Sequence, residues 1–398
     1  MPVNYQEIRQ QIIQRGREAP QQQARIRQQV DQARQLLHDH DGQMEALRQL
    51  VAEAQRENDA LRCAVPLAEN LTQTFAPPQQ SPECILLAAD GSQVTPSRHD
   101  AVEFGVINIG VIRLQPGTNQ PPVEKVFSRF LCFDDLNTPE GPLTEEMVTL
   151  RRDLDERKVL AELAEEEKHS ALPVIALTDG PLELYRDPKG GPAYQNALGA
   201  YQEVLRRLRE MKTATAGYVD RSRSDLVVRL LELLTLTKEE LRRGVYKRKF
   251  DRLVDAHLYS SLLQPYNRSA VFAIQSPSAQ RFEEDLALRF FYLNLAVPTM
   301  ARAHPYLARV EIPKWVADEP FLIDLLHGAL VAQCRLMGNQ PYPYVLHRAH
   351  EVAVIKLDEK KVISEMFLTE LRNNGVDVGG MSYKQLAKDH SGNRTRCK

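Results

Sequence analysis

Two apolar stretches of this chain each end on an aspartate that is followed by a glycine. The first is CILLAADGSQV (84–94) and the second is LPVIALTDGPL (172–182), so Asp90 and Asp179 hold the same place in both. A single Asp-Gly after an apolar run usually marks a turn. Two stretches with matching layout instead favour neighbouring buried strands that end on carboxylates. We therefore expect a fold that places these strands, and their aspartates, side by side.

The remaining segments predict the other elements of the fold. Residues 102–117 and 123–133 are β-rich and flank the turn QPGTNQPP, which predicts an antiparallel hairpin that extends the first strand. Residues 143–168 have leucines at helical spacing and predict a helix. The order of three strands, helix, strand, helix and strand predicts an α/β fold with a mixed sheet flanked by helices. This order matches a ribonuclease H-like layout, in which carboxylates on the first strand, the first helix and the fourth strand meet at one sheet edge.

The N-terminal region has a different composition. Residues 5–62 are rich in Gln, Arg, Glu and Ala, and apolar residues recur in alternating steps of four and three from Ile26 onward, interrupted near Gly42. This heptad pattern fits either a long amphipathic helix packed on its own domain or a coiled-coil arm for self-association. We therefore expect an N-terminal helical or coiled-coil segment, a Pro-rich linker and one main domain, over residues 1–75, 76–83 and 84–390.

Composition limits the compartment and the class of partner. The 398 residues are 43% hydrophobic and 26% charged with a net charge of −2, so nucleic-acid binding would depend on local basic patches. The five scattered cysteines form no CxxC pair and no zinc spacing, which indicates a reduced compartment. The N-terminus MPVNYQEIRQQ has no signal-peptide core, and no apolar run reaches about 18 residues. We expect a cytoplasmic protein without membrane contact.

The paired aspartates suit metal-assisted hydrolysis of a phosphodiester. Two divalent ions about 3.5–4 Å apart activate a water and neutralise charge at phosphorus, and Mg²⁺ or Mn²⁺ prefer carboxylate oxygens with an occasional histidine. Asp90 and Asp179 are the candidate ligand pair, and Ser92 is a candidate ligand or phosphate contact. The helix after the hairpin offers Glu156, which follows two arginines, or Glu162. Six positions apart on a helix, these two point about 120° away from each other; we favour Glu156.

A second group of candidates lies near the C-terminus. The stretch GNQPYPYVLHRAHEVAVI (338–355) contains Tyr342, Tyr344, His347 and His350 within nine residues. A histidine there can bind a metal, protonate a leaving oxygen or hold a phosphate, and Tyr342 can donate to a phosphate. Pro-Tyr-Pro is also turn chemistry, so a His-rich surface turn is the competing interpretation.

Basic residues gather in two stretches in the middle of the chain. In VDRSRSD and LRRGVYKRKFDR they are Arg221, Arg223, Arg242, Arg243, Lys247, Arg248 and Lys249, with Tyr246 and Phe250 interleaved. Taken singly, each is more typical of a solvated helix face. As a cluster in a nearly neutral chain they predict contacts to the DNA backbone and to stacked bases.

Five motifs in this order resemble those of the NurA nucleases. They are AADGSQV, RRDLDERKVLAEL, ALTDGPL, GYVDRSRSDLVVRLLELL and YPYVLHRAHEVAVI. The resemblance implies a ribonuclease H-like fold and a Mn²⁺-dependent 5′-to-3′ exonuclease and single-strand endonuclease; Mg²⁺ suits the same ligands. It also implies a homodimer that acts on DNA ends with a hexameric HerA-type ATPase, in end resection and double-strand break repair.

The resemblance also implies roles for individual residues. Asp90 and Asp179 match the metal aspartates, Glu156 (with Glu162 as the alternative) matches the helix glutamate, and His350 and Tyr342 match the C-terminal histidine and tyrosine. The alternative function is a catalytically silent DNA-binding adaptor that acts through the N-terminal coiled coil. The intact acidic set favours the enzyme, and assignments as ATPase, serine hydrolase or zinc protease lack support because no Walker A, GxSxG or HExxH motif occurs.

Overall fold

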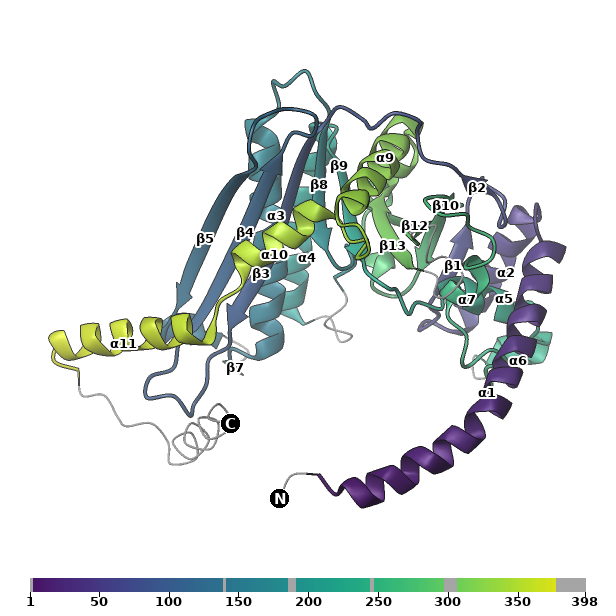
Figure 1. Ribbon diagram of the computed structural model, residues 1–398, viewed down its shortest axis with the longest axis horizontal. Helices are drawn as coiled ribbons and strands as arrows, with labels where there is room; N and C mark the ends of the chain where they lie inside the picture. The colour runs from purple at the N-terminus through teal and green to yellow at the C-terminus, as the bar shows by residue number, and fades with distance from the viewer. Residues whose placement is uncertain (1–2, 139–140, 185–190, 244–246, 297–305, 377–398) are drawn as a thin grey trace. The chain divides into compact units, whose positions relative to one another are not determined.

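The computed structural model describes the chain as two compact units (Figure 1). One unit comprises Met1–Ser81, Gly180–Glu183 and Gly217–Pro341, and the other comprises Pro82–Asp179, Leu184–Ala216 and Tyr342–Lys398. The residues whose structure is described are 3–138, 141–184, 191–243, 247–296 and 306–376.

The second unit is built on a mixed sheet with the strand order β5-β4-β3-β8-β9. β3 (Ile85–Val94), β4 (Gly105–Leu114) and β5 (Val123–Leu131) are antiparallel neighbours, which confirms the predicted hairpin. β8 (Val174–Asp179) pairs with β3 in parallel, and β9 (Ala214–Val219) follows it. A three-stranded antiparallel meander followed by a parallel strand is the ribonuclease H-like arrangement, as the sequence predicts.

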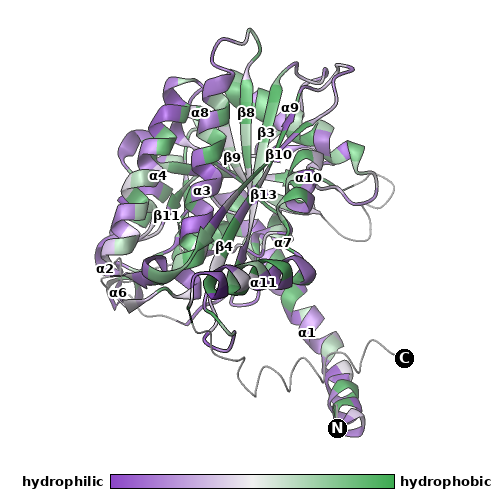
Figure 2. Cartoon of the chain, turned by 90° about the vertical axis from the view of Figure 1, so that its left-hand side faces the viewer, coloured by the Kyte–Doolittle hydropathy of each residue, from purple (hydrophilic) through white to green (hydrophobic). Residues whose placement is uncertain are grey.

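Helices cover both faces of this sheet. α3 (Glu145–Glu166) contacts β3, and α10 (Tyr344–Ala353) contacts β3 and β4. Gly91 faces α3 and Gly110 faces α10. Because Gly110 pairs with Asp90, and neighbouring side chains of a strand point to opposite faces, the two helices lie on opposite sides of the sheet. Residues Ile85 to Ala89 are accordingly buried, and Figure 2 shows the hydrophobic character of β3 and β8.

The other elements of the second unit are short or peripheral. Thr144 caps the N-terminus of α3, and its side-chain oxygen accepts a hydrogen bond from the Met147 N–H. The described part of the unit also contains a short separate ladder, β6 (Asn137–Thr138) and β7 (Gly141–Pro142), and the helices α4 (Pro192–Glu210) and α11 (Leu357–Asn373).

The first unit contains an antiparallel sheet with the order β1-β11-β12-β13, and β13 pairs with Gly217–Val219, the part of β9 that belongs to this unit. Its strands are β1 (Cys63–Pro66), β2 (Thr74–Phe75), β10 (Arg268–Ser269), β11 (Phe272–Gln275), β12 (Leu288–Asn294) and β13 (Leu307–Pro313). Its helices after the N-terminal region are α5 (Leu226–Leu233), α6 (Lys238–Arg243), α7 (Asp255–Tyr259), α8 (Lys314–Ala317) and α9 (Pro320–Leu336).

The N-terminal region forms two helices, α1 (Tyr5–Asp39) and α2 (Met44–Glu57). Gly42, at φ +85°, lies in the turn between them, a conformation that favours glycine. α1 buries residues only in its second half, namely Gln29, Val30, Ala33 and Leu37. That half packs on its own unit, where the Gln29 side chain donates to the Lys249 carbonyl at 2.7 Å. The first half is largely exposed. The apolar residues of the heptad pattern from Val30 to Leu61 are buried, which fits the alternative of an amphipathic helix packed on its own domain. The coiled-coil arm for self-association stays a prediction.

Among the helices that the structure describes, none is both long enough and apolar enough to cross a membrane.

Candidate active site

Asp90 lies inside strand β3, and the prediction that it ends a strand is wrong. β3 continues to Val94 because its backbone keeps pairing with β4 on one side, through Asp90–Gly110 and beyond. The parallel pairing with β8 on the other side stops at Ala89–Thr178. Asp90 therefore lies where the ladder with β8 ends, not where its own strand ends.

Asp179 is the last residue of β8 and is exposed to solvent. Because Ala89 pairs with Thr178, Asp90 and Asp179 come next, at the same level of two adjacent parallel strands. Gly180 follows at φ +87°, a conformation that glycine adopts without strain. The matching Asp-Gly layout of the two stretches thus reflects neighbouring strands, as predicted.

The helix carboxylate beside this strand is Glu156, not Glu162. The structure places Glu156 Oε1 against Gly91: a Cβ atom built on Gly91 would lie 2.5 Å from it. Glu156 is only 3% exposed, whereas Glu162 is exposed on another face of α3. The glycine after Asp90 therefore leaves room for the side chains of Glu156 and Arg152 to pack against β3.

Burial and charge both act on Glu156. Burial raises the pKa of Glu156 to about 8; Arg157 and Arg152 oppose this rise, and the negative charges of Asp153 and Asp90 add to it. The Arg152 Nε atom lies 3.2 Å from Glu156 Oε1. The terminal nitrogen of Arg152 donates to Asp153 Oδ1 at 2.8 Å. A buried carboxylate thus shares its surroundings with two other carboxylates and two guanidinium groups.

His350, on α10, contacts Asp90 on the face of the sheet opposite to α3. Its Nδ1 atom lies 2.7 Å from Asp90 Oδ2. An ionised carboxylate can only accept a hydrogen bond, so Nδ1 donates and Nε2 keeps a lone pair in the neutral ring. The stretch that carries His350 is a helix and not the surface turn of the competing interpretation.

The C-terminal end of α10 is held on the sheet by polar contacts. The Ser92 hydroxyl and the Asn108 amide both donate to the Ala353 carbonyl, each at 2.8 Å. The Ser92 oxygen also accepts from the Ile355 N–H at 3.0 Å. A Cβ atom on Gly110 would lie 2.5 Å from the Ala353 nitrogen, so glycine permits this packing. Ser92 thus anchors α10, and its contact with metal or DNA stays a prediction.

Tyr342 lies two residues before α10 and is half-buried, eight positions ahead of His350. Its role as a site residue stays a prediction.

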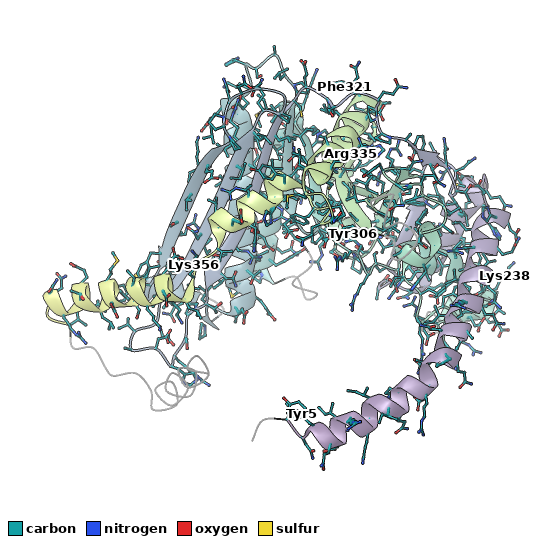
Figure 3. All side chains as sticks on the ribbon, viewed as in Figure 1. Tyr5, Lys238, Tyr306, Phe321, Arg335 and Lys356 are labelled. Atoms are coloured by element: carbon teal, nitrogen blue, oxygen red, sulfur yellow. The ribbon has the colours of Figure 1, made fainter. Side chains whose placement is uncertain are left out.

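The predicted DNA-binding basic residues all belong to the first unit. Arg221 stacks on Tyr306, labelled in Figure 3, with 4.9 Å between the guanidinium carbon and the ring centroid. Arg248 is engaged in ion pairs, at 2.8 Å with Asp225 and 2.9 Å with Glu232. The exposed members of the group are Arg221, Arg223, Arg243, Lys247 and Lys249. The side chain of Arg242 and the whole of Tyr246 lie outside the described residues.

Sequence reasoning missed three contributors to this site. The pairing of Arg152 with Glu156 could have been predicted from the sequence, since residues four apart on a helix are neighbours. Gly110, a glycine inside a β-rich stretch, signals a close backbone approach. Asn108 gave no signal, because its partner Ala353 is 245 positions away.

The donor chemistry fits a hard divalent ion. Asp90, Asp179 and Glu156 supply carboxylate oxygens, and His350 supplies an imidazole nitrogen, which together are typical ligands of Mn²⁺ or Mg²⁺. Within the described ranges, no three His, Cys, Asp or Glu side chains lie close enough together to hold an ion.

A ribonuclease H-like α/β scaffold with carboxylates at adjacent strands defines the class of this protein. The chain belongs to the NurA family, since residues 84–355 match the model of the NurA domain. No curated protein sequence matches it.

Solved structures of similar fold include the NurA nuclease from Sulfolobus solfataricus, with 13% identity, coverage of 76% of this chain and 88% of that one, and a TM-score of 0.49. NurA bound to dAMP and manganese has 12% identity, coverage of 72% and 88%, and a TM-score of 0.35. The catalytic domain of human endonuclease V has 13% identity, coverage of 81% and 98%, and a TM-score of 0.31. The family assignment rests on the family model alone.

Proposed function

We propose that this chain is a divalent-metal-dependent nuclease that hydrolyses DNA phosphodiesters. The observation that carries the proposal is the placement of Asp90 between His350, which contacts it directly, and Glu156, whose carboxylate packs beside the next residue of the same strand. Membership of the NurA family supports it. The NurA protein from Sulfolobus solfataricus is a nuclease, and another NurA structure contains dAMP and manganese.

In this proposal Asp90, Glu156, Asp179 and His350 hold the metal, and Tyr342 contacts the substrate. A bound Mn²⁺ or Mg²⁺ would activate water and neutralise charge at phosphorus. Asp90 keeps the proton of His350 on Nδ1, so that Nε2 presents its lone pair.

The finer activity and partners follow from the family resemblance. We propose Mn²⁺ as the ion, with Mg²⁺ as an alternative, and 5′-to-3′ exonuclease and single-strand endonuclease activity. The chain would act as a homodimer with a hexameric HerA-type ATPase in DNA end resection and double-strand break repair. Ser92 and the basic group of the first unit, from Arg221 to Lys249, would contact DNA; its exposed cationic members suit phosphate contacts.

The test is cleavage of single-stranded DNA labelled at the 5′ or the 3′ end, with Mn²⁺, Mg²⁺ or chelator. We compare the wild-type protein with Asp90→Asn and with the matched control Glu162→Gln, an exposed carboxylate on the same helix that carries Glu156. We expect metal-dependent cleavage that Asp90→Asn abolishes and Glu162→Gln retains, and the label pattern gives the polarity. Absence of cleavage with every metal and with the ATPase added, while DNA is still bound, would support the adaptor function instead.

A further inference from the structure

The guanidinium group of Arg152 contacts two carboxylates of α3, those of Glu156 and Asp153. Its Nε atom is 3.2 Å from Glu156 Oε1, and its terminal nitrogen donates to Asp153 Oδ1 at 2.8 Å. The negative charge of Asp90 also acts on it. Arg152 therefore places a permanent positive charge beside these carboxylates, because an arginine does not lose its proton in proteins.

The side chain of Arg152 is built into the unit and is not a solvated surface chain. Its stem packs on β3, since a Cβ atom on Gly91 would lie 2.6 Å from Arg152 Cγ and 2.8 Å from Cδ. The side chain is 23% exposed. Its Nε atom is buried and forms no hydrogen bond with any residue that the structure describes. The stem thus holds the guanidinium group beside Glu156.

The neighbouring Arg151 differs in this respect. Its terminal nitrogen donates to the Asp135 carbonyl at 3.4 Å. Arg151 and Arg152 are adjacent residues of the same type on α3. Because successive residues of a helix point about 100° apart, Arg151 does not share the contact of Arg152 with Glu156. It is the matched control for Arg152.

We propose that Arg152 is the resident counter-ion of the acidic cluster and competes with the divalent cation for the Glu156 carboxylate. This inference rests on the proposed function, in which Glu156 is a metal ligand. The Glu156 oxygen that meets Arg152 cannot give its full attraction to a second cation, and two cations a few ångströms apart repel each other. Once Glu156 is ionised, Arg152 therefore weakens metal binding and partly neutralises the cluster until an ion enters.

The test is isothermal titration of the full-length protein with Mn²⁺ in the absence of DNA, at pH 8.5, where Glu156 is largely ionised. We expect Arg152→Gln to lower the Kd for Mn²⁺ by roughly tenfold or more, as expected when one nearby elementary charge is removed. Arg152→Lys, which keeps the charge, should stay within about threefold of wild type, a change of about 0.7 kcal/mol or less. Arg151→Gln should match wild type. An unchanged or weaker affinity of Arg152→Gln would overturn the inference.

A second measurement uses wild-type protein, in case Arg152→Gln does not fold. The Nε–H signal of Arg152 is followed by NMR in arginine-labelled protein during a Mg²⁺ titration, with Arg152→Lys used for assignment. A shift that saturates with ion binding supports competition; an unmoved signal in ion-loaded protein overturns it. Asp90→Asn separates the two proposals. If neither wild type nor this variant binds Mn²⁺, the proposed function fails. If Asp90→Asn abolishes binding but Arg152→Gln leaves it unchanged, only the role of Arg152 fails.

Discussion

Replacing Glu156 by glutamine should remove a large pH dependence from the stability of this protein. Burial raises the pKa of Glu156 from 4.5 to about 8, so the folded state binds this proton more tightly than the unfolded state does. The sign follows from proton linkage: the contribution of Glu156 to stability is complete below pH 4.5 and is lost as the pH rises through about 8. A glutamine has the shape of the protonated side chain and cannot ionise.

The size of the effect follows from the same shift. A rise from 4.5 to about 8 corresponds to roughly 5 kcal/mol, at about 1.4 kcal/mol for each pH unit. We take this as a ceiling, because relaxation and entry of water reduce the cost of a buried charge. We expect Glu156→Gln to be about 2–3 kcal/mol more stable than wild type at pH 8.5, and nearly equal to it at pH 5.

The assay is urea unfolding at several pH values between 5 and 8.5 with chelator present, so that divalent ions do not contribute. Glu162→Gln is the control, since it removes an exposed carboxylate from the same helix. The reasoning is refuted if the difference in unfolding free energy between Glu156→Gln and wild type is constant across this pH range, or if wild type is the more stable at high pH. Either result would mean that burial does not outweigh the effect of the neighbouring guanidinium groups on the pKa of Glu156.

Three further predictions concern packing and ligation. Gly110→Ala should destabilise the protein by about 1–3 kcal/mol in urea unfolding, because its Cβ would collide with the α10 backbone, and an unchanged unfolding curve would count against this packing. Leu37→Ala, in the buried half of α1, should cost about 2–5 kcal/mol, whereas Ile12→Ala in its exposed half should change stability by less than about 0.5 kcal/mol; equal effects in thermal unfolding would contradict the division of α1. Mn²⁺ at 100 times its Kd should stabilise wild type by about 2.7 kcal/mol and Asp90→Asn far less, measured by thermal shift; equal stabilisation would place the ion elsewhere.

Much of the fold of the second unit could be predicted because its signals are local. The hairpin of β4 and β5 follows from two β-rich runs around one turn, and α3 follows from leucines at helical spacing. The adjacency of β3 and β8 was also predicted, from their matching Asp-Gly endings.

The position of Asp90 within its strand was not readable in this way. An apolar run indicates the part of a strand that is buried on both faces by helices. The backbone hydrogen bonds that define the strand do not depend on the character of its side chains. β3 therefore continues past its apolar part to Val94, held by β4. The sequence showed the end of burial and not the end of the ladder.

The sequence alone determined which residue types are present and which strands carry them: aspartates in two similar strands, a glutamate helix between them and a histidine near the C-terminus. Tertiary structure decided which of these meet. The choice of Glu156 over Glu162 depends on the rotation of α3 against Gly91, and the contact of His350 with Asp90 joins residues 260 positions apart. Such contacts depend on packing between elements distant in the chain, which no local pattern encodes.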